Sequence, residues 1–215
     1  MDHAVALVRT YLQLNGYLTV TEYPVLEAAR HGGHRTLTDL DVLAFRFPGA
    51  GRLTTGTVGH AGARGETPPR FEPDPVLGVA STEADMIVGE VKEGRARLNE
   101  GLLRPDVLEV VLARFGCCAP EQAHALAQAL IDRGTTTMPA GHRVRLVVFA
   151  SVVEPVAQPG LLVVPLGHVV AFLQRTVSDY WDVLHHAQLK DPVLGFLMTL
   201  RKARRRASSP TEIPR

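Results

Sequence analysis

Cysteine, lysine and long apolar runs are all scarce in this chain of 215 residues. The two cysteines, Cys117 and Cys118, are adjacent, so the sequence offers neither a disulfide framework nor the spacing of a zinc ribbon. We expect both to be buried near the end of a helix. The longest mostly apolar stretch, residues 161–173, contains a proline, a glycine and a histidine. It falls short of the roughly 18 residues that a membrane-spanning helix needs.

An excess of charge of one sign is also missing, because the net charge is only +1. Residues 201–215 contribute a net +5, which leaves −4 for residues 1–200. A nucleic-acid binder of this composition must rely on local patches and metal ions rather than on a global positive field. Hydrophobic residues make up 46% of the chain, which indicates a folded globular protein. The start of the sequence lacks the features of a secretory leader, so the expected location is cytoplasmic.

The order of helical and strand patterns predicts an α/β fold. Apolar residues in the first predicted strand, Leu18, Val20 and Leu26, recur on one face. Residues 17–26 and 36–47 are expected to pair as a hairpin, and the apolar run at 85–92 is typical of a strand buried on both faces. The full set is helices at 3–14, 105–115, 120–133, 167–185 and 191–206, and strands at 17–26, 36–47, 85–92, 143–153 and 161–165.

This order predicts a mixed sheet flanked by helices, followed by a helical C-terminal extension. We expect residues 1–185 to form the α/β domain, with a long Gly- and Pro-rich loop at 48–75. Residues 186–206 are predicted to form a C-terminal helix, and 207–215 a flexible tail.

Charged side chains interrupt two of the apolar strands. Glu90 and Lys92 are two residues apart and therefore leave the same face of their strand. Asp39 and Asp41 share a face of the preceding strand, and Asp41 leads directly into an apolar run. Ionised groups inside core strands cost several kcal/mol unless they are paired or bound to metal. The lysine also stands out because the chain has 20 Arg and only three Lys.

The sequences D-V-L-A at 41–44 and I-V-G-E-V-K at 87–92, after an opening helix and a hairpin, resemble the PD-(D/E)XK nuclease superfamily. The resemblance covers about residues 3–170 as an order of elements, and Asp41, Glu90 and Lys92 as motif residues. Leu40 stands where the motif usually has proline, and 48 residues separate Asp41 from Glu90, more than in many members. The resemblance implies a restriction-endonuclease-like fold.

The resemblance also implies a site and an activity. Asp41, Glu90 and the backbone carbonyl of Val91 are the expected ligands of Mg²⁺, with Mn²⁺ as an alternative, and Lys92 is expected to orient or activate the attacking water. Hard oxygen ligands suit Mg²⁺, which can stabilise charge on a phosphodiester and lower the pKa of a bound water. The predicted function is a metal-dependent nuclease, with DNA favoured over RNA as its substrate.

Two other interpretations stay open. The chain can be a non-catalytic nuclease-fold subunit that binds nucleic acid or a protein partner in a repair or defence complex. It can also be a structural scaffold in which Asp41, Glu90 and Lys92 form only an ion-pair network. The intact motif favours the enzyme. A homodimer or a larger assembly is compatible with each interpretation.

Several further residues are weaker candidates. Glu22 can add a carboxylate to the site or reach solvent at a strand edge, and Asp39 can replace Asp41 as a ligand. His31 and His34 are expected to lie in a solvated turn rather than to form a metal pair. The adjacent residues His185 and His186 cannot both face one site on a helix, because neighbouring residues diverge by about 100°.

Arginines are the candidate contacts to nucleic acid. Arg95 and Arg97 follow the motif lysine, and Arg104 comes soon after; each can contact phosphates or face solvent. The run RKARRR at 201–206 is either an arm that binds the nucleic-acid backbone or a solvated helix end. The residues predicted to bind nucleic acid are Arg95, Arg97, Arg201, Arg204 and Arg205.

Overall fold

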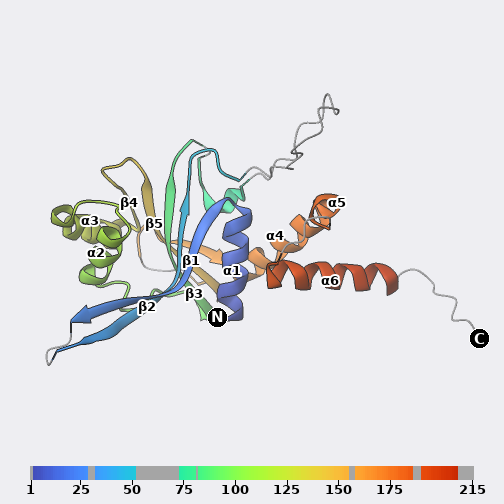
Figure 1. Ribbon diagram of the computed structural model, residues 1–215, viewed down its shortest axis with the longest axis horizontal. Helices are drawn as coiled ribbons and strands as arrows, with labels where there is room; N and C mark the ends of the chain where they lie inside the picture. The colour runs from blue at the N-terminus through green and yellow to red at the C-terminus, as the bar shows by residue number, and fades with distance from the viewer. Residues whose placement is uncertain are drawn as a thin grey trace, which may run out of the picture.

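The computed structural model (Figure 1) describes residues 2–28, 32–51, 73–80, 82–154, 158–185 and 190–207. These residues form one mixed sheet of six strands in the order β1-β2-β3-β5-β4, with β6 also paired to β5. The strands are β1 (Tyr17–Ala28), β2 (His34–Arg46), β3 (Asp85–Arg95), β4 (Thr135–Thr137), β5 (Arg143–Val152) and β6 (Leu162–Pro165). The predicted α/β class with a mixed sheet is therefore confirmed.

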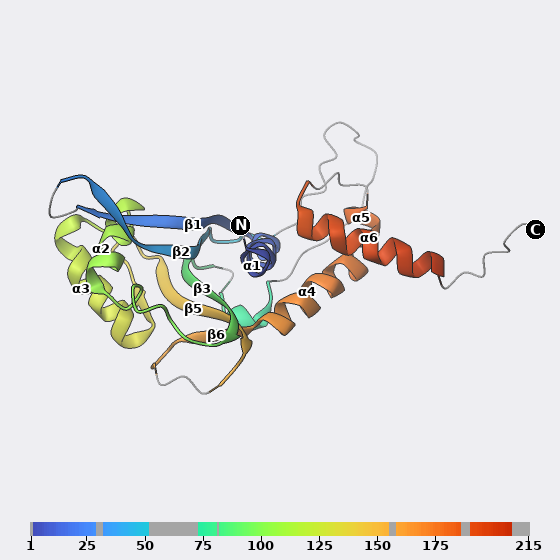
Figure 2. The same cartoon turned by 90° about the horizontal axis from the view of Figure 1, so that it is seen from below.

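Helices cover both faces of this sheet. The helices α1 (His3–Leu14) and α4 (Leu166–Asp179) pack on one face, and α2 (Pro105–Arg114) and α3 (Pro120–Arg133) pack on the other. The last two helices, α5 (Trp181–Leu184) and α6 (Pro192–Ala207), lie beyond α4 and away from the sheet in Figures 1 and 2. None of the described helices is long and apolar enough to cross a membrane.

The direction of the strands follows from their connections. β1, β2 and β3 pair antiparallel, and the predicted hairpin of the first two strands is confirmed. The chain then crosses through α2 and α3 before it forms β5, which pairs parallel to β3. Such a helical crossover is what a parallel pair requires. β3 therefore lies inside the sheet, between β2 and β5.

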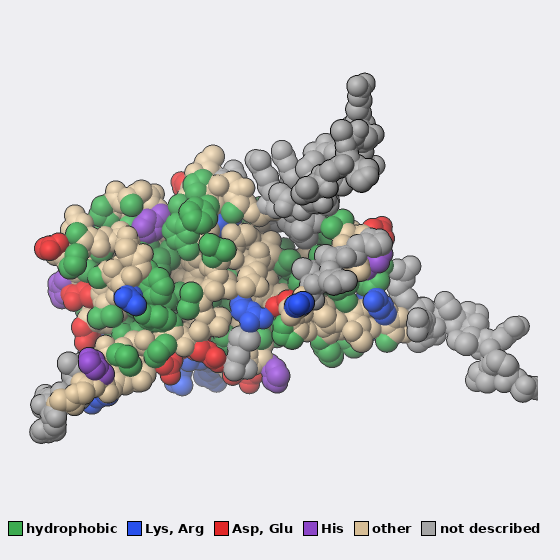
Figure 3. Space-filling model, in the orientation of Figure 1, with side chains coloured by type: hydrophobic (Ala, Val, Ile, Leu, Met, Phe, Trp, Pro, Cys, Tyr) green, Lys and Arg blue, Asp and Glu red, His purple; other side chains and the backbone are tan. Residues whose placement is uncertain are grey.

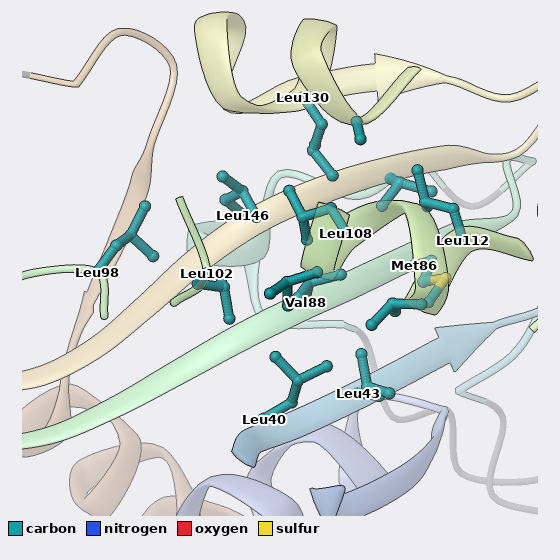
Figure 4. Packing of buried hydrophobic residues seen from close by; sticks show 14 of the residues in the cluster. Leu40, Leu43, Met86, Val88, Leu98, Leu102, Leu108, Leu112, Leu130 and Leu146 are labelled. Atoms are coloured by element: carbon teal, nitrogen blue, oxygen red, sulfur yellow. The ribbon is translucent and has the colours of Figure 1, made fainter. Parts of the chain in front are cut away.

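Alternating side chains of β3 fill two separate cores, as its apolar run predicts. Met86 and Val88 pack under α2 and α3, whereas Ile87 and Val91 pack against α1 and α4. Figure 4 shows the first core, where leucines of β2, α2, α3 and β5 surround the side chains of β3. Burying each such side chain stabilises the fold by about 1.5–3 kcal/mol, so the centre of β3 is held firmly from both faces.

Local sequence signals set the helix ends. The Asp2 carboxylate accepts a hydrogen bond of 2.8 Å from the backbone nitrogen of Ala4 and so caps α1. Pro120 opens α3, and Gly134 ends it in the left-handed region with a φ of 68°. Both ends of α3 match the sequence-based prediction.

A buried polar cluster joins three strands at the end of the sheet where β3 begins. Asp85 is fully buried, and its carboxylate accepts hydrogen bonds from Tyr17 (2.6 Å), Arg145 (2.7 Å) and Arg143 (3.0 Å). Burial and the charge of Asp85 raise the pKa of Tyr17. The cluster fixes the starts of β1, β3 and β5 relative to one another.

The predicted helix at 167–185 is wrong in its length, because two helices replace it. The helix α4 ends at Asp179, and the chain turns at Tyr180 before α5. After the turn, Leu184 is 2% exposed and packs with Leu194 of α6. The packing of Leu184 against α6 therefore stabilises the turn at Tyr180 more than one continuous helix would be stabilised by its own backbone hydrogen bonds.

Two further differences concern strands. The sequence analysis missed β4, which has three residues and is too short to show a period. The apolar face of β1 is largely exposed rather than buried, with Leu18 66%, Val20 43% and Leu26 51% exposed. β1 forms one edge of the sheet, and the larger core under α2 and α3 is built mainly from the strands inside this edge. Residues 52–72 of the predicted loop and 208–215 of the predicted tail lie outside the described residues.

Candidate functional site

The candidate site lies where β2 and β3 stop pairing. The ladder between them runs from the pair Arg46–Asp85 to the pair Val42–Gly89. One step further along this register, Asp41 is opposite Glu90. The ladder does not continue there, because Asp41 Oδ2 accepts a hydrogen bond of 2.8 Å from the backbone nitrogen of Val91. The strand order thus brings together two carboxylates that have 48 residues between them in the sequence.

Glu90 is a carboxylate enclosed by the fold. The residue is 1% exposed, and one of its oxygens, Oε1, forms an ion pair with Lys92 Nζ. The other oxygen, Oε2, is buried and has no hydrogen-bond partner. Burial raises the pKa of Glu90, and the nearby charge of Asp41 raises it further, while the contact with Lys92 opposes this shift. An unpartnered, buried carboxylate oxygen is costly unless another positive group binds it.

Lys92 connects this carboxylate to the surface. Its side chain is 29% exposed, compared with 2% for that of Glu90. It lines a pocket of about 340 Å³ together with Gly94, Arg95 and Arg97. A ligand that enters this pocket meets the lysine and the two arginines.

The donor set is compatible with a single hard cation. Asp41 and Glu90 supply carboxylate oxygens, and Val91 lies between Glu90 and Lys92 with its backbone nitrogen already bonded to Asp41. The backbone carbonyl of Val91 is the third ligand that the sequence resemblance implies. Among the described residues, no three His, Cys, Asp or Glu side chains gather to hold a metal. Mg²⁺ can still bind through one or two carboxylates, because it keeps several waters.

The loop after β3 contributes a residue that the sequence analysis missed. The backbone of Asn99 lies near Glu90 and lowers the pKa of its carboxyl slightly, and Asn99 Nδ2 donates to Thr38 Oγ1 over 3.3 Å. The Asn99 side chain also accepts a hydrogen bond of 3.1 Å from the backbone nitrogen of Gly101. The loop therefore links β2 to Glu90. The only sequence signal was the turn-forming N-x-G at 99–101.

The structure does not bring the two additional carboxylates to Glu90. Glu22 is exposed, has a φ of 53°, and accepts a hydrogen bond of 3.2 Å from the backbone nitrogen of Asp2. Asp39 is exposed and pairs with Pro24 on the part of the hairpin that extends beyond β3. The unusual backbone at Glu22 redirects a side chain that the strand periodicity placed with Leu18 and Val20.

The histidine candidates do not form a metal pair within the described part of the chain. His34 is exposed at the start of β2, and His31 lies outside the described residues. His185 stacks on Trp181 with ring centroids 5.5 Å apart, and His186 also lies outside the described residues. His34 and His185 thus lie in two different parts of the fold.

The cysteine prediction holds for one residue of the two. Cys117 is 4% exposed and its Sγ lies 3.4 Å from Met86 Sδ, whereas Cys118 is half-buried. Burial raises the pKa of Cys117 to about 11. The thiol is therefore protonated and unreactive at neutral pH.

The candidate arginines occupy two separate regions. Arg95 forms an ion pair with Glu154 over 3.5 Å, Arg97 is exposed beside Lys92, and Arg104 pairs with Asp106. Arg201 and Arg204 instead line a groove of about 560 Å³ between α4 and α6. Of these arginines, Arg95 and Arg97 line the pocket of Lys92.

In the second region, the Arg201 guanidinium lies 5.0 Å from the ring centre of Trp181 and donates a hydrogen bond of 3.1 Å to the carbonyl of Val177. Part of its role is therefore to hold α6 against α4 and α5. The side chain of Arg205 lies outside the described residues.

Comparisons of the chain with protein-family models, with curated proteins and with solved structures found no match.

Proposed function

We propose that this chain is a metal-dependent nuclease that hydrolyses phosphodiester bonds, with DNA as its preferred substrate. The observation that carries the proposal is the buried, unpartnered Oε2 of Glu90, which lies beside Asp41 and Lys92. Two carboxylates close together disfavour ionisation of both, and a divalent cation held by Asp41 and Glu90 would relieve this repulsion. A structural ion pair of Glu90 and Lys92 alone leaves that oxygen without a partner.

The order of elements supports a restriction-endonuclease-like arrangement. A helix precedes three antiparallel strands, and a helical crossover leads to a strand parallel to the third. Asp41 lies on the second of these strands, and Glu90 and Lys92 lie on the third. This is the order of elements and motif residues that the sequence resemblance implies.

Each residue has a separate task in the proposed reaction. Asp41 and Glu90, with the carbonyl of Val91, would hold Mg²⁺ or Mn²⁺. When bound, such an ion lowers the pKa of a coordinated water and stabilises negative charge on the phosphodiester. The ammonium group of Lys92, which contacts Glu90 while the side chain lines the pocket, would orient the attacking water. Arg95 and Arg97, on the same pocket, bind the phosphates that flank the cut bond.

The groove between α4 and α6 supplies a second contact with the nucleic-acid backbone. Arg204 lines this groove, and the next two residues of α6 are also arginines. Backbone contacts of this kind position a nucleic acid without reading its sequence.

Single-turnover cleavage of labelled single-stranded, double-stranded and branched DNA, and of RNA, tests the proposal. We expect Mg²⁺-dependent or Mn²⁺-dependent cutting by the wild type and none by Glu90→Gln. Glu93→Gln is the matched control, because Glu93 is an exposed carboxylate on the same strand. No cutting of any substrate by the wild type would overturn the enzymatic proposal in favour of a non-catalytic subunit.

A further inference from the structure

Independently of the candidate site, the outer edge of β1 lacks the features that usually protect a sheet edge. β1 is the first strand in the sheet order, and β2 is its only neighbouring strand among the described residues. Residues 17–21 contain no charged side chain and no proline. Native proteins normally guard an exposed edge with charges, prolines or backbone irregularities, because a free edge can pair with another chain.

Protection begins immediately after this segment. Glu22 carries a charge and a φ of 53°, and Pro24 follows two residues later. The register between β1 and β2 then shifts between Val25 and Leu26. The unprotected edge is therefore confined to residues 17–21, and the same strand protects its second half.

The face beside this edge is apolar and exposed. Leu18 pairs with Phe45 and Val20 pairs with Leu43, and all four side chains line one groove of about 380 Å³. Leu18 is 66% exposed and Val20 is 43% exposed, although their alternation is typical of a buried strand face. Phe115, 41% exposed, lines the same groove. In Figure 3 hydrophobic side chains gather over this part of the molecule. Exposed apolar side chains arranged in this way are available to pack against another chain.

We propose that residues 17–21 pair antiparallel with the same residues of a second copy of this chain. A two-fold axis perpendicular to the sheet at Thr19 places Leu18 opposite Val20 of the second copy, and Tyr17 opposite Thr21. The two sheets then join into one, and the apolar residues of both copies lie side by side on the same face.

The sequence of the edge favours a second copy over an unrelated strand. The alternation of apolar and polar side chains along this edge is symmetric about Thr19, because the apolar residues Leu18 and Val20 lie on its two sides. No like charges come opposite one another in this register, since Glu22 falls opposite Gly16 of the second copy. Self-pairing thus meets no electrostatic penalty.

Analytical ultracentrifugation with complementary charge variants tests the proposed register. One variant carries Leu18→Lys with Val20→Lys, and the other carries Leu18→Glu with Val20→Glu. Each variant alone places like charges opposite one another in the dimer, whereas a mixture of the two forms opposite-charge pairs. The matched control is Leu26→Lys, an exposed leucine on β1 beyond the proposed register.

We expect the wild type and Leu26→Lys to sediment at twice the chain mass of 23.3 kDa. Each charge variant is expected to sediment at the single mass, and their mixture at twice this mass. Circular dichroism of each variant verifies that the fold is kept. A monomeric wild type would overturn the proposal, as would charge variants that remain dimeric alone. A mixture that stays monomeric would overturn the register.

Discussion

The carboxylate of Asp41 receives the backbone N–H of Val91 across 2.8 Å, at the point where β2 and β3 cease to pair. One side chain thereby does two things. It ends the ladder between the strands, and it holds a carboxylate beside Glu90. The proposed metal site is therefore part of the structure of the sheet, not an addition to its surface.

Substitutions of Asp41 separate these two roles. Asparagine keeps a side-chain oxygen that can accept the N–H of Val91, whereas alanine leaves this group without a partner. We expect Asp41→Ala to be less stable than Asp41→Asn by about 1 kcal/mol, the usual contribution of one hydrogen bond. Urea unfolding measures the difference. Asp39→Ala, an exposed position two residues earlier, should unfold like the wild type. Equal stability of the two Asp41 variants would show that the hydrogen bond does not support the sheet.

The pKa of Glu90 makes stability depend on pH. Because burial raises this pKa, the folded protein binds the proton more tightly than the unfolded chain does. Without metal, the free energy of unfolding should fall as the pH rises from about 4 through the folded-state pKa. Each unit of pKa elevation lowers the stability at neutral pH by about 1.4 kcal/mol.

Chemical denaturation from pH 4 to 8 in the presence of a chelator measures the slope of the free energy of unfolding against pH. Glu90→Gln, which cannot ionise, should lose this part of the slope, and the exposed-site variant Glu93→Gln should keep it. A Glu90→Gln variant with an unchanged slope would assign the pH dependence to other groups.

Lys92 is expected to serve the chemical step and not only to balance the charge of Glu90. Lys92→Arg keeps a positive charge next to Glu90, but guanidinium stays protonated and is bulkier than an ammonium group. We expect this variant to fold and bind metal yet cut at least about 100-fold more slowly under single-turnover conditions. The control is Lys190→Arg, at an exposed lysine. Cutting by Lys92→Arg at nearly the wild-type rate would limit the lysine to a counter-ion.

The arginines of α6 can be tested through the salt dependence of binding. Arg204→Gln, Arg205→Gln and Arg206→Gln, combined in one variant, leave Arg201 in place against Trp181. The logarithm of the binding constant falls linearly with the logarithm of the salt concentration. Each replaced arginine that binds a phosphate of duplex DNA should make this slope shallower by about 0.9. Fluorescence anisotropy with DNA, measured without metal, gives this slope. The control Arg114→Gln, at the end of α2, should leave it unchanged. A slope unaffected by the triple variant would remove α6 from the nucleic-acid interface.

Sequence periodicity was sufficient for the elements that fill the cores. The hairpin, the doubly buried β3 and the helices α2 and α3 have apolar patterns long enough to predict. β4 has three residues, and the break between α4 and α5 depends on packing against α6, so neither has a local signal. The exposure of Leu18 and Val20 was also unpredictable, because alternation does not show which strand lies at the edge of a sheet.

The candidate site was only partly predictable for a related reason. The spacing of Glu90 and Lys92 places both on one face of a strand, and the structure joins them in an ion pair. The hydrogen bond from Val91 to Asp41 and the contact from Asn99 involve backbone groups, which every residue possesses. Such contacts depend on where strands end and loops return, and no pattern of side chains encodes them.

Isothermal titration with Mg²⁺ or Mn²⁺ tests most directly whether the unpartnered oxygen of Glu90 belongs to a metal site. The wild type and Glu93→Gln should each bind one ion, with a matching increase in thermal stability. Glu90→Gln should fold but show neither effect, because the amide lacks the charge that attracts the ion. Metal binding by Glu90→Gln equal to that of the wild type would contradict the account.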